Sequence, residues 1–218
     1  MRKMNGEEFD PLVPFFDAMA CTNWLSDVHF QLKQATGSWV GKKVLDVGCG
    51  TGRLLLRGVD EASQVVGVDL SEGMIQAAIE LYNEKSKNNK ASFQVGDAYH
   101  LPFTENEFDL VLSTCVLFLL PEPDKGMKEM IRVVKDGGMI VMLNPSEHMN
   151  QLAAADYCKQ NNITQFEETT LLKWSNISTL RHRYNSEELS TFLRDCGAKE
   201  INHLPVVGDL ALITICKF

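Results

Sequence analysis

The sequence predicts an α/β protein whose core is a doubly wound, mostly parallel sheet of seven strands with helices on both faces. Two observations support this fold class. Strand-like and helix-like patterns alternate from Lys43 onward, and the last two strand-like runs are separated by a turn short enough for an antiparallel hairpin. The 218 residues, 44% of them apolar, are enough to bury one ordinary core, so we expect a single domain.

The expected strands are short apolar runs bounded by polar or glycine-rich segments. The first five, which should be parallel, are residues 44–47, 64–68, 91–95, 108–112 and 139–143. The last two are residues 200–206 and 210–217, joined by Val207-Gly208-Asp209. This final pair predicts the antiparallel hairpin.

Amphipathic helices are expected between these strands. The clearest carries Met127, Met130, Ile131 and Val134 at helical spacing and is expected to end at Asp136-Gly137-Gly138. We interpret these methionines as core residues, because a helix that covers a sheet must bury one such stripe.

A second helix is expected near the end of the chain. Either Asn185 or Ser186 caps its start and Gly197 ends it. Its expected apolar face consists of Leu189, Phe192, Leu193 and Cys196.

Two segments do not follow the alternation. Residues 1–40 contain scattered aromatic side chains and are expected to form a helical N-terminal cap. Residues 145–184 are expected to form a partly helical insertion after the fifth strand. Residues 43–144 then form the ligand-binding core, and residues 185–218 supply the last helix and two strands.

Composition argues against several classes of protein. The net charge of −8 argues against nucleic acid as the substrate, because a polyanion would be repelled. The start of the chain, Met1-Arg2-Lys3-Met4, runs into a polar stretch, so no signal peptide is expected. The longest apolar stretch, 110–120, is too short for a membrane span. The six cysteines are scattered singly, which favours a reduced cytoplasmic protein with no metal site.

The first expected strand ends in a glycine-rich loop, Asp46-Val47-Gly48-Cys49-Gly50-Thr51-Gly52, and Arg53 to Leu56 are expected to open a helix after it. Glycines let a ligand approach the backbone, and the helix N-terminus would favour an anionic group. The dehydrogenase fingerprint requires a third glycine at position 53, where this chain has arginine. Cys49 is expected to contribute its backbone, with no nucleophilic role for its thiol.

Two acidic positions follow the next strands. Gly67-Val68-Asp69 places a carboxylate about 20 residues beyond the glycine loop, the spacing at which an acidic side chain binds ribose hydroxyls. Asp69 could instead cap the following helix, although Ser71 can do so itself. Gly96-Asp97-Ala98 follows the third strand, where Asp97 is either a turn residue or an acceptor for an exocyclic amino group. Apolar faces for a purine could come from Leu70, Met74 and Ala98.

Taken together, five segments of this chain resemble the class I S-adenosylmethionine-dependent methyltransferases in order and spacing. The subgroup to which they are most similar is the small-molecule branch related to the ubiquinone and menaquinone biosynthesis methyltransferases. The resemblance is strong over residues 43–144 and weaker beyond residue 184. The segments are residues 44–53, 67–71, 96–103, 108–111 and 132–138.

The resemblance implies a Rossmann-like methyltransferase fold and S-adenosylmethionine as the cofactor, with S-adenosylhomocysteine as the product. Gly48, Cys49, Gly50 and Gly52 would lie against the methionine part, and Asp46 would position its amino group. Asp69 would bind the ribose, and Asp97 with Ala98 would meet the adenine. Ser113 and Thr114 would border the sulfonium and the acceptor.

Two departures from related subgroups bear on the acceptor. The stretch Ser113-Thr114-Cys115-Val116 lacks the Asn/Asp-Pro-Pro-Tyr/Phe motif of enzymes that methylate amino groups of DNA bases. The quinone methyltransferases often have Ala-Gly-Gly-Thr-Gly in the loop, whereas this chain has Gly48-Cys49-Gly50-Thr51-Gly52, which counts against a quinone precursor.

We therefore predict methyl transfer to a small-molecule acceptor by in-line displacement, a reaction that needs positioning more than a catalytic base. No catalytic residue is assigned, and the sequence gives no oligomeric state. The cap and the insertion are expected to form a lid that selects the acceptor. Possible bases within it are His29, His148, His182, Tyr157 and Tyr184. The alternatives are a non-catalytic S-adenosylmethionine-binding module and an NAD-dependent oxidoreductase.

Overall fold

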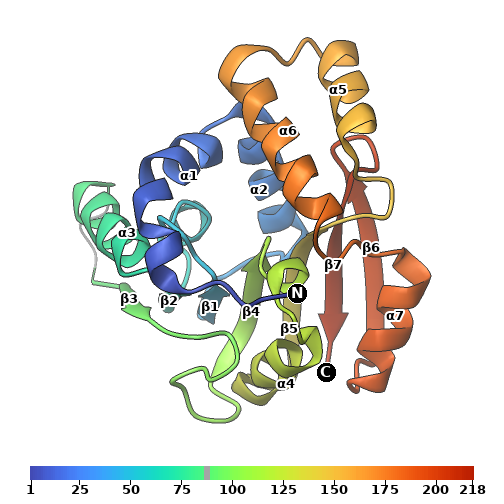
Figure 1. The fold of residues 1–218 in the computed structure, drawn as a ribbon. Helices are drawn as coiled ribbons and strands as arrows, with labels where there is room; N and C mark the ends of the chain where they lie inside the picture. The colour runs from blue at the N-terminus through green and yellow to red at the C-terminus, as the bar shows by residue number, and fades with distance from the viewer. Residues whose placement is uncertain (86–88) are drawn as a thin grey trace.

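A seven-stranded sheet forms the centre of the molecule in the computed structural model, which describes residues 1–85 and 89–218 (Figure 1). The strand order is β3-β2-β1-β4-β5-β7-β6. Strands β1 to β5 pair in parallel, and β7 is antiparallel to both β5 and β6. The strands are β1 (Lys43–Val47), β2 (Gln64–Asp69), β3 (Ala91–Val95), β4 (Phe108–Thr114), β5 (Val134–Pro145), β6 (Glu200–Val206) and β7 (Ala211–Lys217). The predicted fold class is confirmed.

The strand order reverses at β1, because β2 and β4 both pair with β1, on opposite sides, and the later strands continue outward from each of them. In open α/β sheets, ligands bind beyond the carboxyl ends of the strands at this reversal. The region to search for a ligand site is therefore the one where β1 and β4 end, at Val47 and Thr114.

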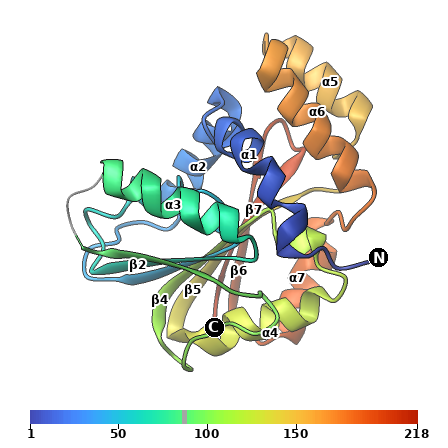
Figure 2. The same ribbon diagram turned by 60° about the vertical axis from the view of Figure 1, so that its left-hand side comes forward.

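Helices cover both faces of the sheet. Helices α1 (Val13–Ala20), α2 (Asn23–Ala35) and α3 (Glu72–Lys85) lie on one face, and α4 (Pro123–Val133) and α7 (Ser186–Asp195) lie on the other (Figure 2). Two hydrophobic clusters result, because alternate strand residues point to opposite faces. Val44 belongs to the cluster that includes α2, and its neighbour Leu45 belongs to the cluster under α4 and α7.

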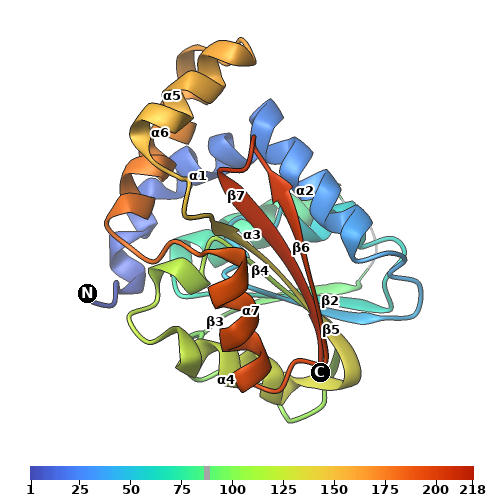
Figure 3. The ribbon, with the colours of Figure 1, turned by 90° about the vertical axis from the view of Figure 1, so that its right-hand side faces the viewer.

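Helices α5 (Gln151–Gln160) and α6 (Gln165–Thr179) occupy the predicted insertion and stand beyond the sheet, next to α2 and β7 (Figure 3). Trp24 of α2 stacks on Trp174 of α6 with ring centroids 5.6 Å apart, and the Trp24 indole donates to Thr170 Oγ1 at 3.0 Å. The N-terminal cap and the insertion thus pack against each other.

Two helix predictions are wrong in detail. After the glycine loop the chain forms only a short 3-10 helix, η3 (Leu55–Arg57), because Gly58 ends it after one turn. Helix α4 ends at Val133, so Val134 begins β5 and pairs with Phe108. Asp136-Gly137-Gly138 accordingly lies within β5 and does not end the helix.

The start of α7 is settled in favour of Asn185. Its Oδ1 accepts from the backbone N–H of Glu187 at 2.8 Å and of Glu188 at 3.4 Å, and Gly197 follows the helix with a φ of +101°. An Asn185→Ala variant should lower the free energy of unfolding by about 1 kcal/mol, because the first turn loses its acceptor. Urea unfolding checks this, and an unchanged midpoint would contradict the capping role.

The part of the chain that the structure describes contains no helix that is both long and apolar enough to cross a membrane. Within residues 1–85 and 89–218, no three His, Cys, Asp or Glu side chains lie close enough together to hold a metal ion.

Candidate cofactor-binding site

The glycine loop is fixed to the neighbouring strand by its own backbone. The N–H groups of Gly48 and Cys49 both donate to the carbonyl of Val68, at 2.7 and 3.0 Å. Gly48, Gly50 and Gly52 have φ angles of +73°, +52° and +77°, a region that disfavours residues with a Cβ. A Cβ on Gly48 would lie 2.1 Å from Val116 Cγ2, whereas a Cβ on Gly50 would meet no described atom within 4 Å. The backbone at Gly50 therefore borders open space.

Asp69 links the glycine loop to the start of α3. Its Oδ2 accepts from the backbone N–H of Gly50 and its Oδ1 from that of Ser71, both at 2.9 Å. Burial raises the pKa of Asp69, although these backbone N–H groups oppose the shift. Ser71 Oγ accepts from Met74 N at 3.0 Å and so caps α3, as the sequence suggested. Each Asp69 oxygen keeps a free lone pair, so the carboxylate can still accept from a ligand hydroxyl.

Asp46 is the most unusual polar group of the site. Its side chain is fully buried, and neither carboxylate oxygen has a hydrogen-bond partner among the described residues. Burial, with a smaller contribution from the charge of Asp69, raises the pKa of Asp46 to about 8. A buried carboxyl without partners is costly, and an incoming donor or cation would satisfy it.

Cys49 is also buried in this loop. Burial, followed by the charges of Asp69 and Asp46, raises the pKa of its thiol well above the ordinary value. A thiol held in its neutral form is a poor nucleophile, which agrees with a backbone role for Cys49.

Asp97 occupies a turn after β3, and its Oδ1 accepts from Tyr99 N at 2.9 Å. Its Oδ2 forms an ion pair with Lys3, whose ammonium also lies 4.3 Å from the centroid of the Tyr99 ring. Burial acts to raise the pKa of Asp97, but Lys3, the backbone N–H of Tyr99 and His100 together outweigh it, so the pKa is lowered. Sequence reasoning missed Lys3, because no local pattern connects two residues 94 positions apart.

The apolar residues predicted near Asp97 differ in exposure. Met74 is buried on α3, whereas Leu70 and Ala98 are partly exposed in the turns after β2 and β3. Because β2 and β3 are parallel neighbours, with Asp69 opposite Val95, these two turns lie side by side. The structure thus brings together the segments that carry Asp69 and Asp97.

More polar atoms without partners lie where β4 and β5 end. Ser113 Oγ and Asn144 Nδ2 are buried and have no hydrogen-bond partner in the described part of the chain. Asn144 Oδ1 accepts from Phe118 N at 3.2 Å, and His182 N donates to Phe118 O at the same distance. Cys115, next to Thr114, has a φ of +59°, a strained conformation of the kind found at functional sites.

The predicted bases lie in three different places. His182 and Tyr184 stack with ring centroids 6.2 Å apart beside the segment after β4, and His182 Nε2 is buried without a partner among the described residues. His29 is buried on α2, where burial and then Arg57 lower its pKa to about 4. His148 and Tyr157 border a different hollow, beside Gly208.

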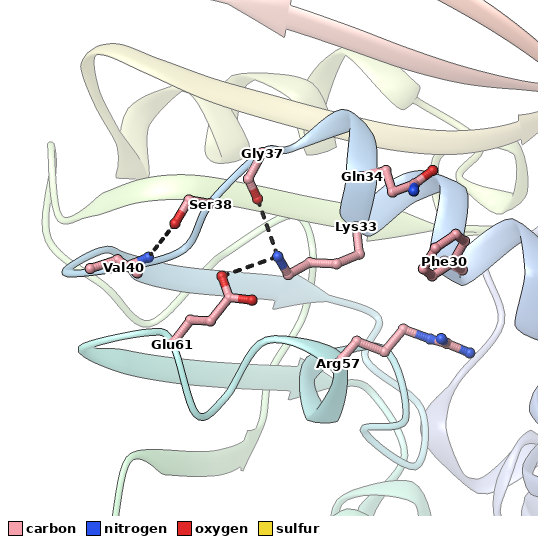
Figure 4. A pocket seen from close by; sticks show the side chains of 8 residues that line it. All are labelled: Phe30, Lys33, Gln34, Gly37, Ser38, Val40, Arg57 and Glu61. Atoms are coloured by element: carbon pink, nitrogen blue, oxygen red, sulfur yellow. Dashed lines mark hydrogen bonds and ion pairs between the residues drawn. The ribbon is translucent and has the colours of Figure 1, made fainter.

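A larger hollow of about 610 Å³ lies away from these residues, between α2 and η3 (Figure 4). It includes Gly37 and Val40, which precede the first residue of β1, so it opens at the amino end of that strand. This hollow is outside the predicted site. Its lining residues are Phe30, Lys33, Gln34, Gly37, Ser38, Val40, Arg57 and Glu61.

The doubly wound sheet defines a Rossmann-like protein, and the glycine loop with the two following carboxylates forms a candidate nucleoside site at the carboxyl ends of its strands. Residues 39–194 match the family described as "Methyltransferase domain". The chain belongs to this methyltransferase family, and the predicted kinship with class I S-adenosylmethionine-dependent methyltransferases is confirmed.

Named relatives agree with this assignment. A demethylmenaquinone methyltransferase of Desulfitobacterium hafniense is 40% identical over 107 residues, which are 48% of this chain and 42% of that protein. A demethylmenaquinone methyltransferase of Lactobacillus johnsonii is 26% identical over 88% of this chain and 80% of its own length. A solved SAM-dependent methyltransferase of Aquifex aeolicus has a TM-score of 0.64 at 19% identity, over 86% of this chain and 88% of its own. The matches near 40% identity span less than half of those relatives.

Proposed function

We propose that the protein binds S-adenosylmethionine where β1 to β4 end and catalyses transfer of its methyl group to a small-molecule acceptor, with S-adenosylhomocysteine as the product. The observation that carries this proposal is the buried Asp46 carboxyl, which has no partner among the described residues, close to the open space at Gly50. An amino group supplied by a ligand would satisfy Asp46. The names of the relatives agree with this cofactor.

The site residues suit the parts of S-adenosylmethionine in turn. Gly48, Cys49, Gly50 and Gly52 would present backbone to its methionine part, with Asp46 beside the amino group. Asp69 would accept from the ribose hydroxyls next to Leu70. Asp97 and Ala98 would meet the adenine, with Met74 on its apolar side, and Ser113 and Thr114 would border the sulfonium.

When bound, the cofactor supplies a methyl group already activated by a positive sulfur. The protein's own contribution is therefore to hold the acceptor in line with that methyl group and to exclude water. The helices of the N-terminal cap and of the insertion are suited to this role, since the Trp24–Trp174 stack joins them to each other. We assign the predicted lid to these two segments.

For the acceptor, we propose a small ring compound with an ionisable hydroxyl, of which a demethylated quinol is the first to test. The names of the relatives favour it, although Gly48 and Cys49 depart from the Ala-Gly pair typical of quinone enzymes. Ser113 Oγ, Asn144 Nδ2 and His182 Nε2 offer polar atoms without described partners at the ends of β4 and β5. His182 is the residue best suited to accept the hydroxyl proton.

The first test is the melting temperature with S-adenosylmethionine, S-adenosylhomocysteine and NAD, each at about 100 times its dissociation constant. One-site binding then adds about 2.7 kcal/mol, or roughly 5 to 11 °C for a chain of this size. We expect this shift with the two sulfur nucleosides and its loss in Asp69→Ala. A shift with NAD alone would instead establish the oxidoreductase alternative.

Asp109→Ala is the matched control for Asp69→Ala. Asp109 also accepts from a backbone N–H, that of Lys43 at 2.8 Å, but it lies near the amino end of β4. This variant should melt at a lower temperature and keep the full ligand shift. Release of S-adenosylhomocysteine in the presence of demethylated quinols would then separate an enzyme from a non-catalytic binding module.

A further inference from the structure

The N-terminal segment contacts all three loops of the proposed cofactor site. From the third residue of the chain to the middle of α1, one charged side chain reaches the turn after each of β3, β2 and β1 in succession. We call residues 2–17 the strap. Figure 2 shows this segment crossing above the ends of the strands, between α3 and α6.

Each of the two inner contacts of the strap consists of two hydrogen bonds. Asp17 receives two hydrogen bonds from Arg53, from Nε at 2.7 Å and from Nη2 at 2.8 Å, directly after the glycine loop. Asp10 Oδ1 accepts from Ser71 Oγ and from the backbone N–H of Gly73, at the start of α3. Paired and bidentate charge-assisted hydrogen bonds are the stronger kind, so this part of the strap is firmly attached.

The middle of the strap lies directly on the turn after β2. A Cβ on Gly6 would lie 2.2 Å from the carbonyl oxygen of Leu70, so the two backbones touch. Asn5 and Glu8 form a reciprocal capping box around this glycine, which stiffens the segment. The strap can therefore open at its outer end without losing its local structure.

The outer contact, between Lys3 and Asp97, is the weakest of the three. Both side chains are about one-third exposed, at 33% and 31%, so solvent screens the pair. Lysine is a point charge on a flexible stem, and this one lies near the chain terminus. The Tyr99 ring, 4.3 Å away, offers the ammonium a second favourable position when it leaves the carboxylate.

We propose that Lys3 acts as an internal counter-ion that occupies Asp97 in the free protein and must release it before the amino group of adenine can bind there. The outer end of the strap then opens each time cofactor and product exchange. This inference rests on the proposed function. It makes Lys3 a gating residue that competes with the cofactor for one carboxylate. Its neighbour Arg2 pairs with Glu8 within the strap, through hydrogen bonds of 2.8 and 2.6 Å, and the Arg2 carbonyl accepts from Arg181 of the insertion at 3.0 Å.

The test compares S-adenosylhomocysteine binding to the full-length wild type, Lys3→Ala and Lys3→Arg, by calorimetry for affinity and stopped-flow fluorescence for rates. Lys3→Ala should bind about two- to fivefold more tightly and associate faster, because a partly exposed ion pair no longer has to break. Lys3→Arg should bind more weakly than the wild type, since arginine can hold a carboxylate through two hydrogen bonds. In 0.5 M salt, all three affinities should converge.

Lys43→Ala is the matched control. Lys43 also forms an ion pair, with Glu107 at 2.6 Å, and lies 5.0 Å from an aromatic centroid, that of Phe108, but it starts β1 at the far end of the strand. The affinity of the Lys43→Ala protein for S-adenosylhomocysteine should equal that of the wild type. Weaker or unchanged binding by Lys3→Ala, with the wild type binding normally, would overturn the gating role alone. Absence of binding by the folded wild type would overturn the proposed function with it.

Discussion

An Asp46→Asn variant should be clearly more stable than the wild type at pH 8 and nearly equal to it at pH 4. Burial raises the pKa of Asp46 to about 8 in the folded protein, whereas an unfolded chain ionises near pH 4. Between these values the folded protein holds a proton that the unfolded chain has released. The free energy of unfolding therefore falls as the pH rises, by about 1.4 kcal/mol per pH unit.

Asparagine keeps the shape of the protonated carboxyl and does not titrate. The stability difference between the two proteins should thus open above pH 4 and reach several kcal/mol at pH 8. Urea unfolding at pH 5, 6.5 and 8 measures it. Parallel pH profiles for the two proteins would show that Asp46 finds a partner in solution and would remove the main support for the proposed site.

An Asp109→Asn variant should show the opposite pH dependence of the stability difference from the wild type. Burial acts to raise the pKa of Asp109, but Lys135 and the backbone of Lys43 outweigh it, so the pKa is lowered. The stability that this carboxylate contributes is present above its unfolded pKa and is lost as the pH falls below it. The Asp109→Asn protein should therefore differ from the wild type most at neutral pH and converge with it in acid.

Ligand binding should change the protonation of Asp46. An ammonium group placed beside the carboxyl would favour its charged form and lower its pKa, so S-adenosylhomocysteine binding near pH 7 should release a proton. Calorimetry in two buffers of different ionisation enthalpy detects that proton. The Asp46→Asn protein should release none and bind more weakly.

The central strands β1, β2 and β4 were predictable because they are apolar and buried and their ends are marked by glycine or by polar residues. Val44 to Val47 is one example, and the loop that follows it needs glycine at three positive φ angles. The junction of α4 and β5 was not predictable. Val133 and Val134 are both buried, so the apolar run fits a helical period and a strand equally well.

The candidate site likewise contains residues that could be predicted from the sequence and residues that could not. Asp46, Gly50 and Asp69 lie on consecutive elements, and the strand–loop–strand pattern placed them together. Lys3 and Asn144 gave no such signal, because their partners lie far away in the sequence: Asp97 for Lys3, and Phe118 for Asn144. Long-range pairs depend on how the cap and the strands pack, which a local pattern does not encode.

A Gly50→Ala variant should remain folded and lose its affinity for S-adenosylhomocysteine, whereas Gly37→Ala should keep it. Both glycines have positive φ, +52° and +66°, and a Cβ on either would meet no described atom within 4 Å. Each alanine should therefore cost the same 1 to 2 kcal/mol or so of backbone strain. Only the Cβ on Gly50 would enter the space assigned to the methionine part of the ligand, so we expect about 100-fold weaker binding, equivalent to roughly 2.7 kcal/mol. Calorimetry on both variants separates strain from steric exclusion, and equal affinities would place the ligand away from the glycine loop.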